Sequence, residues 1–480
     1  MPDAAFPAAL PGPHPAFLFG WRGNLVRFAR DPIGYTTKMR QQFGDLAAFV
    51  RGGSGGLNST FPQCPGVVFA FGPRYNQQLL TDTATFHSTL LTGLENTKYE
   101  RLICGLLRMN GEQHKQQRRL MMPAFQKKRI EAYAEDIVAI TRQALDTWRM
   151  GERRDLAADM RQLSLRIAGK ILFGLATLED ADNMGRRIVR WLELIGSPGV
   201  LLFPWDWPYS PYRKMLRLSR RLDAAIASMI KDKRAEGQDA GDVLSMLIHS
   251  RDTDGSRMSE DELVGQATLL FMAGHETTAN ALAWTLFLLA QHPKVAADLH
   301  DELAGKLHGE APTPDDLVGL PHLENVVRES MRLLPPVPFG SRTAISQVSV
   351  GTYDLPPFTE VLFSQYHTHH SPEIYAEPER FRPERWEKFE PTPYEYLPFA
   401  AGPRMCIGAS LAMMEARIVL AIILQRVRLE LLPRTRLDRF VNITLSPKQG
   451  LPMIVRTQDR EFARSRAEMR GNIREMVECG

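Results

Sequence analysis

The chain has 480 residues, of which 44% are hydrophobic and 24% are charged, and its formal net charge is +4. This composition is typical of a soluble globular protein. The net charge is small for this length and is spread widely along the chain, so nothing in it indicates binding to nucleic acid.

The four cysteines, Cys64, Cys104, Cys406 and Cys479, lack close pair spacing. They therefore suggest neither a disulfide framework nor a zinc site built from several cysteines. This usage fits a reducing compartment, where a lone thiolate can persist as a ligand, and it predicts a cytoplasmic protein. No signal peptide or membrane anchor is visible, because five prolines interrupt residues 1–20.

The first hundred residues predict a proline-rich start, a short helix and a hairpin. The helix is expected over Pro32–Phe43, and the strands over 47–51 and 67–71, which have β-enriched residues bounded by turn signals. Residues 52–56 read Gly-Gly-Ser-Gly-Gly and begin an irregular connection between the two strands.

Residues 111–332 are expected to be overwhelmingly helical from their apolar periodicity, and no repeat or long linker divides them. One stretch of this region is strongly basic against a single acid, Glu112. Its cations are Lys115, Arg118, Arg119, Lys127, Lys128 and Arg129. The stretch is either a solvated helix face or a docking patch for an acidic protein partner.

The clearest predicted helix spans 259–291. It begins with a capping box, Ser259 at the N-cap and Glu262 three residues on, and it ends at His292-Pro293. It would be roughly 48 Å long, enough to cross a whole domain. Because His275 and Glu276 lie at its centre, we interpret it as the buried axis of a large protein rather than a membrane span. Further helices are expected over 293–307 and 322–334.

Short β-like pieces are expected over 342–368, with His367, His369 and His370 at their end. In an extended segment neighbouring side chains point to opposite faces, so these histidines do not predict a metal site. A zinc peptidase motif is also excluded in the long helix, because Ala279 stands where the second histidine would follow His275-Glu276.

Residues 399–408 read Phe-Ala-Ala-Gly-Pro-Arg-Met-Cys-Ile-Gly and precede an apolar helix expected over 407–427. A Cys406 thiolate would lie at the helix N-terminus, where free N–H groups favour negative charge, with the Arg404 cation two residues away. The alternative is a buried structural cysteine. The segment resembles the cysteine-ligand loop of the haem-thiolate cytochrome P-450 monooxygenases, Phe-x-x-Gly-x-Arg-x-Cys-x-Gly, at every specified position.

The resemblance implies the fold of the soluble bacterial-type members: mostly α with small peripheral β-sheets, in one domain over 1–455. It implies haem b as cofactor, Cys406 as axial ligand of the iron, Phe399 packed beside the thiolate, and Arg404 paired with a haem propionate. Residues 456–480 form a charged extension of unknown role, either helical or loose.

Residues 273–278 read Ala-Gly-His-Glu-Thr-Thr, an unusual group for the middle of a helix. Such residues are either a polar kink in a packed helix or an opening that admits dioxygen and water. They resemble the family's oxygen-activation motif, which implies that Thr277 stabilises the oxygen-bound state and that Glu276 relays protons through water.

Further resemblances name supporting residues. Glu329 and Arg332 match the family's structural Glu-x-x-Arg pair, completed by Arg385, or by Arg380 in a nearby duplicate segment. His114 and Arg118, one turn apart, match cations that hold the propionates, and Arg342 matches a third position. Lys115 stands where arginine is common in the family.

The sequence thus predicts a haem-thiolate monooxygenase that hydroxylates or epoxidises an apolar small molecule. Fatty acyl, terpenoid, steroid and polyketide-like substrates stay open. Substrate contacts are expected over 86–107, 194–212, 269–277, 337–339 and 442–445. Without a flavin or nicotinamide site, the electrons would come from a ferredoxin or flavodoxin with its reductase. The alternatives are a peroxide-driven or isomerising haem-thiolate enzyme, and a haem-binding sensor without turnover.

Overall fold

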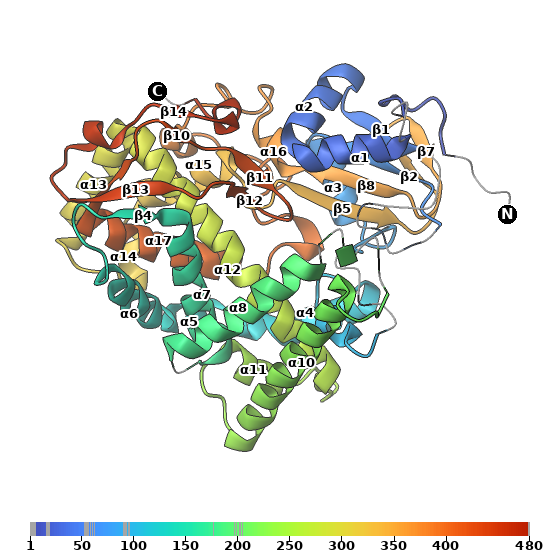
Figure 1. The fold of residues 1–480 in the computed structure, drawn as a ribbon, viewed down its shortest axis with the longest axis horizontal. Helices are drawn as coiled ribbons and strands as arrows, with labels where there is room; N and C mark the ends of the chain where they lie inside the picture. The colour runs from blue at the N-terminus through green and yellow to red at the C-terminus, as the bar shows by residue number, and fades with distance from the viewer. Residues whose placement is uncertain are drawn as a thin grey trace.

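The structure is a computed structural model. It describes residues 6–15, 20–51, 63–89, 97–175, 177–195 and 205–478, and the positions 57, 59, 61, 94, 197, 199, 200 and 203. Figure 1 shows a small β-sheet region that carries the N-terminal helices, beside a larger region built from helices.

The main sheet has five strands in the order β1-β2-β8-β5-β3, with β2 and β8 parallel and the other pairs antiparallel. Its strands are β1 (Leu46–Arg51), β2 (Gly66–Ala70), β8 (Glu360–Ser364), β5 (Phe339–Ala344) and β3 (Phe86–His87). The expected hairpin is confirmed, because β1 and β2 pair directly.

Both faces of this sheet are covered, because successive strand side chains point to opposite sides. Ala47 and Phe49 of β1 pack in one apolar cluster with Met39 of α2, whereas Ala48 packs in another cluster with Leu79 of α3. The covering helices are α1 (Trp21–Arg30), α2 (Pro32–Phe43) and α3 (Pro73–Thr81). The α2 bounds are those predicted from the sequence.

The helical region surrounds one long helix, α12 (Glu260–Gln291). Its capping box is present: the Ser259 hydroxyl accepts from the Glu262 N–H, and the Glu262 carboxylate accepts from the Ser259 N–H. Most of its residues are buried, as expected for the axis of the molecule. No helix within the described ranges combines the length and apolarity needed to cross a membrane.

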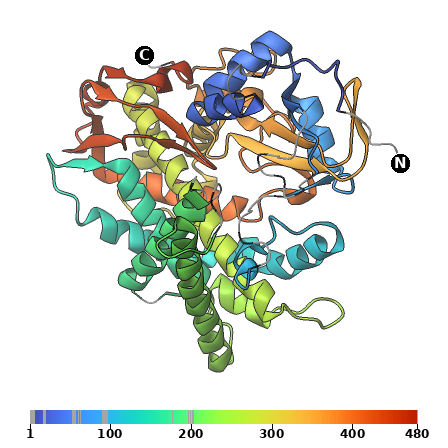
Figure 2. The same cartoon turned by 45° about the vertical axis from the view of Figure 1, so that its right-hand side comes forward.

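Figures 1 and 2 show α8 and α10 side by side on the outer side of α12. The other helices of this region are α4 (Gly111–Met121), α5 (Lys127–Ala132), α6 (Ala134–Leu145), α7 (Leu156–Phe173), α8 (Leu178–Ile195), α10 (Pro211–Glu236), α11 (Val243–His249), α13 (Pro293–Leu307), α14 (Pro314–Val318), α15 (Pro321–Leu333) and α17 (Ala409–Arg426). The fold class predicted from the sequence, mostly α with small peripheral sheets, is confirmed.

One expectation about the histidine segment is wrong. His367 and His369 lie in a one-turn helix, α16 (Gln365–His369), and not in an extended strand. The Ser364 hydroxyl caps this turn by accepting from the His367 N–H, and Thr368 donates back to the Ser364 carbonyl. Serine and threonine compete with strand pairing in this way. Among the described residues no cluster of histidine, cysteine and acid side chains could hold a metal ion.

Small sheets close the periphery and include part of the C-terminal segment. Their strands are β4 (Arg153–Asp155), β13 (Pro452–Thr457) and β9 (Val427–Leu431) in one sheet, β6 (Val348–Val350) with β7 (Tyr353–Leu355), β10 (Thr435–Arg436) with β14 (Met469–Arg470), and β11 (Arg439–Val441) with β12 (Leu445–Pro447).

The residues after 455 were expected to be either helical or loose, and residues 456–478 match neither form throughout, since they hold two short 3-10 helices, Phe462–Ser465 and Asn472–Glu475, and strand β14. Strand β14 pairs in parallel with β10, and Phe462, Ile473 and Met476 are buried. The Arg439 guanidinium binds the Glu475 carboxylate at 2.7 Å. Up to residue 478 this segment is therefore packed onto the rest of the protein.

Candidate functional site

The loop that carries Cys406 is held in shape by its own backbone. The Cys406 N–H donates to the Phe399 carbonyl at 2.9 Å, and α17 begins three residues after the cysteine. Gly402 has φ +71°, and a Cβ there would lie 2.5 Å from the Leu80 carbonyl oxygen, so only glycine fits. The Phe399 side chain packs against the main core.

The Cys406 thiol keeps accessible surface although protein surrounds it on most sides, whereas Cys64 is buried. Burial raises the pKa of Cys406, while the backbone N–H of Gly408 and the charge on Arg118 lower it. The two observations are compatible, because Sγ is open to solvent on one side and surrounded by protein on the others. Such a thiol is placed to bind a ligand and not merely to fill the core.

Four basic side chains from three segments converge near this thiol: His114 and Arg118 of α4, Arg342 of β5, and Arg404 of the loop. Burial lowers the pKa of His114 to about 4, with further lowering by the charges on Arg404, Arg118 and Arg342. Burial also lowers the pKa of Arg342 to about 10, and Arg404 adds to this effect. The pKa of Arg404 is lowered to about 10 by burial and by Arg118.

No carboxylate contacts any of these four basic side chains in the described ranges. Arg404 donates instead to the Met109 carbonyl and to Asn110 Oδ1, the latter at 2.6 Å. The Nε atoms of Arg342 and Arg404 are buried without a hydrogen-bond partner. Buried cations are normally paired, so this group fits an anionic ligand that bears carboxylates close to Cys406.

Residues 273–278 lie within α12, and the helix is not interrupted there. The Thr277 hydroxyl donates to the Ala273 carbonyl at 2.7 Å, one turn back. Glu276 Oε1 accepts from the Thr444 hydroxyl at 2.9 Å. Thr444 lies in one of the segments expected to contact substrate, but its bond to Glu276 had no sequence signal, because 168 positions separate the two.

His275, between these residues, is turned toward a different place. Its Nδ1–H donates to the Phe271 carbonyl at 2.7 Å, and the side chain lines a cleft bounded by α7, α8 and α10. Each position on a helix is rotated by about 100° from the one before, so His275 and Thr277, two positions apart, point to nearly opposite faces.

Glu329 of α15 is the centre of a buried polar network behind the loop. It pairs with Arg332 at 2.9 Å and with Arg385 at 2.9 Å, and it accepts from the Trp386 ring N–H at 3.0 Å. The alternative partner, Arg380, is exposed and pairs with Glu377. Only the backbone carbonyl of Arg380 reaches the network, where it accepts from Arg332 at 3.2 Å.

The remaining predicted positions are placed as follows. Lys115 is exposed and pairs with Glu112 at 2.7 Å. The segments expected to contact substrate lie only partly within the described part of the chain. Outside it are residues 90–93, 95, 96, 196, 198, 201, 202 and 204. Within it, Gly105 approaches Leu269 so closely that a Cβ would lie 2.7 Å from the leucine Cβ, which brings two of the segments together.

Comparison with known proteins agrees with this arrangement. The family model described as Cytochrome P-450 matches residues 12–452. Cyclooctat-9-en-7-ol 5-monooxygenase of Streptomyces melanosporofaciens is 34% identical over 338 residues, covering 68% of this chain and 73% of the relative. Cyclooctatin synthase of the same organism is 34% identical over 361 residues, 72% of this chain and 78% of the relative.

The solved structure of retinoic acid bound cyanobacterial CYP120A1 is 25% identical with a TM-score of 0.80, covering 94% of this chain and all of that one. The family match spans nearly the whole chain and includes the thiol loop and the long helix. The chain therefore belongs to the cytochrome P-450 family, and it is a monooxygenase that binds haem b through a thiolate.

Proposed function

We propose that this protein activates dioxygen at a haem held by Cys406 and inserts one oxygen atom into an apolar, terpenoid-like molecule. The observation that carries the proposal is the meeting of an approachable thiol with three arginines and His114, none of which has an acidic partner in the described part of the chain. A group with two carboxylates and an iron atom matches both features.

The residues present fit haem b in the following roles. Cys406 would be the axial ligand, since coordination deprotonates a thiol and both Arg118 and the Gly408 N–H favour the anion. His114, Arg118, Arg342 and Arg404 would hold the propionates, which supply the missing anions. Thiolate-bound haem supplies the cleavage of the O–O bond.

Proton delivery would fall to Glu276 and Thr277. The Thr444 hydroxyl donates to Glu276 Oε1 and so holds the carboxylate in one orientation beside Thr277. The Thr277 hydroxyl uses its proton on the Ala273 carbonyl, which leaves its oxygen free to accept a hydrogen bond from water. A water between the two side chains would pass protons from Glu276 toward the distal side of the haem.

Replacement of Thr277 tests this role. We expect Thr277→Ala to reduce product formed per oxygen consumed by about tenfold to a hundredfold, with substrate binding unchanged. The matched control is Thr278→Ala, whose hydroxyl contacts the Gly274 carbonyl at a longer distance of 3.4 Å. Product and oxygen consumption are measured together with a redox partner, and equal coupling in both variants would reject the role of Thr277.

Two similar proteins support a terpenoid-like substrate. One is named as a cyclooctat-9-en-7-ol 5-monooxygenase, and the structure of the other, CYP120A1, was solved with retinoic acid bound. The described segments expected to contact substrate add apolar side chains, including Leu269, Met272 and Phe339. We test the proposal by titrating terpenoids and, in parallel, fatty acids and steroids, while following the haem absorption band. Tighter binding of the fatty acids or steroids would reject a terpenoid-like substrate.

For the electron donor we propose an acidic ferredoxin or flavodoxin in the cytoplasm. The basic stretch is partly neutralised by the fold, since Arg119 pairs with Asp252 and Arg129 with Asp239. Lys127 and Lys128 stay exposed, close to Phe125, whose ring approaches Gly408 of the thiol loop. They therefore lie beside the Cys406 loop, where an electron donor would approach the thiolate side of the haem.

Charge reversal tests whether the electron donor binds at Lys127 and Lys128 or responds only to the net charge of the protein. We expect Lys127→Glu with Lys128→Glu to slow haem reduction by about tenfold at low salt and less at high salt, because steering depends on ionic strength. The control reverses two exposed lysines of α13, Lys294 and Lys306, for the same change in net charge. Stopped-flow reduction at equal rates in both variants would exclude this patch.

A further inference from the structure

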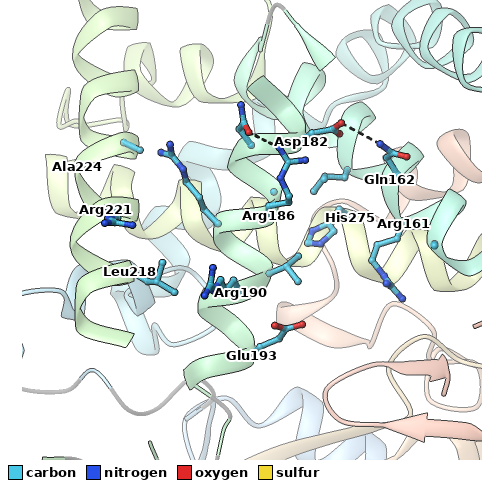
Figure 3. Close-up of a pocket in the computed structure, with 17 residues that line it drawn as sticks. Arg161, Gln162, Asp182, Arg186, Arg190, Glu193, Leu218, Arg221, Ala224 and His275 are labelled. Atoms are coloured by element: carbon cyan, nitrogen blue, oxygen red, sulfur yellow. Dashed lines mark hydrogen bonds between the residues drawn. The ribbon is translucent and has the colours of Figure 1, made fainter. Parts of the chain in front are cut away.

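A cleft between α7, α8 and α10 has a volume of about 1170 Å³, and none of the residues assigned above to the haem lines it. Arginine side chains from all three helices surround it (Figure 3). They are Arg161 of α7, Arg186, Arg187 and Arg190 of α8, and Arg221 of α10. All five are exposed.

The acids of the cleft do not balance these charges. Two carboxylates line it, Asp182 and Glu193. Asp182 is already engaged by Arg166, which donates two hydrogen bonds at 3.0 and 3.2 Å. Within the described ranges none of the five lining arginines has a carboxylate within 4.0 Å.

The spacing of the arginines makes the imbalance unfavourable for the free protein. Arg186 and Arg190 are four residues apart and Arg187 and Arg190 are three apart, so their charges lie on neighbouring positions of α8. Like charges at these spacings destabilise a helix. An anion bound between them would remove the repulsion and form charge-assisted hydrogen bonds, for which the guanidinium fork is suited.

The floor of the cleft connects it with the oxygen-activation segment. His275 of α12 lines it and is only 1% exposed. Figure 3 shows its ring at the centre of the cleft, toward Arg161. An occupant of the cleft would thus contact the turn of α12 that precedes Glu276.

We propose that this cleft binds a small polyanion, a molecule with several phosphate or carboxylate groups. Its volume of about 1170 Å³ lies slightly above the range of roughly 300–1,000 Å³ that is usual for small-molecule sites, so a ligand of nucleotide size fits. The positive charges are spread over three helices, which favours a ligand with more than one anionic group over a single monovalent ion.

The test measures binding of inorganic tripolyphosphate, and of citrate in a parallel arm, to the haem-loaded protein by isothermal titration calorimetry at physiological ionic strength. We expect saturable binding of at least one of them. In the double variant Arg187→Gln, Arg190→Gln the affinity should fall by at least about tenfold, because each lost contact is a charge-assisted hydrogen bond.

The matched control is Arg217→Gln with Arg220→Gln, two exposed arginines of α10 that do not line the cleft. It removes the same charge and should bind as the unchanged protein does. Tripolyphosphate should also raise the melting temperature of the unchanged protein and of the control, but not of the cleft variant. Absence of binding by both anions, or equal weakening in both double variants, would overturn the proposal.

Discussion

Buried charged and titratable side chains affect the stability of this protein at two places. The three arginines around Cys406, Arg118, Arg342 and Arg404, raise the free energy of the folded chain, because burial and mutual repulsion oppose their charges. Haem propionates held by these arginines, as proposed above, would offset this cost, so we expect cofactor binding to stabilise the fold. Glu415 of α17 is the opposite case, a buried acid that accepts a hydrogen bond from the Ser164 hydroxyl at 2.8 Å.

Burial raises the pKa of Glu415 from about 4.5 to about 8, partly offset by the bond from Ser164. Between these two values the folded state binds more protons than the unfolded state, so this residue makes stability fall as the pH rises. Glu415→Gln should remove that effect. As the pH rises across this window, the unfolding free energy of Glu415→Gln should increase relative to that of the unchanged protein by up to about 1.4 kcal/mol per pH unit.

Urea denaturation at several pH values measures this difference. Glu390→Gln, a change at an exposed carboxyl, is the control and should shift the curve equally at all pH values. Parallel pH dependence of Glu415→Gln and the unchanged protein would mean that Glu415 is ionised in the folded state.

At the scale of elements, α15 is joined to the segment before the thiol loop through Glu329 and the side chains of Arg385 and Trp386. These bonds lie in the interior, where a carboxylate that loses a partner is costly. The sequence alone could not determine which arginine pairs with Glu329, because Arg380 and Arg385 occur in similar Pro-Glu-Arg segments five residues apart.

We therefore predict different costs for the two arginines. Arg385→Ala should lower the unfolding free energy by about 2–4 kcal/mol, since it leaves a buried carboxylate less well paired. Arg380→Ala removes exposed ion pairs and should change it by less than about 1 kcal/mol. Urea denaturation of the haem-loaded variants gives both values, and equal losses would show that the paired geometry does not set the stability.

At the scale of the whole molecule, the segment after 455 acts as part of the core. Met476 and Ile473 are fully buried, and the Met476 carbonyl contacts His370 Nε2 at 3.1 Å. The segment lies against the helical region (Figure 1), although its sequence is highly charged. Its arginines and acids face outward or pair, and the apolar residues between them face inward.

Substitutions in this segment should therefore behave as core substitutions. Ile473→Ala and Met476→Ala should each cost about 2–5 kcal/mol in unfolding free energy. Arg474→Ala, at the exposed position between them, should stay within about 0.5 kcal/mol. Chemical denaturation measures all three, and a cost below about 1 kcal/mol for both apolar changes would indicate a weakly attached tail.

The sequence by itself determined the elements whose signals are local. The capping box and apolar run of α12, the proline-bounded α2 and the ten residues of the thiol loop each depend on neighbours along the chain. Of these, the thiol loop indicated both the family and the cofactor. The tertiary structure decided the pairings between distant residues: Thr444 with Glu276, Arg129 with Asp239, Arg385 with Glu329, and the packing of Met476. It also turned His275 toward the arginine cleft. Such contacts depend on packing across many residues, which no local pattern encodes.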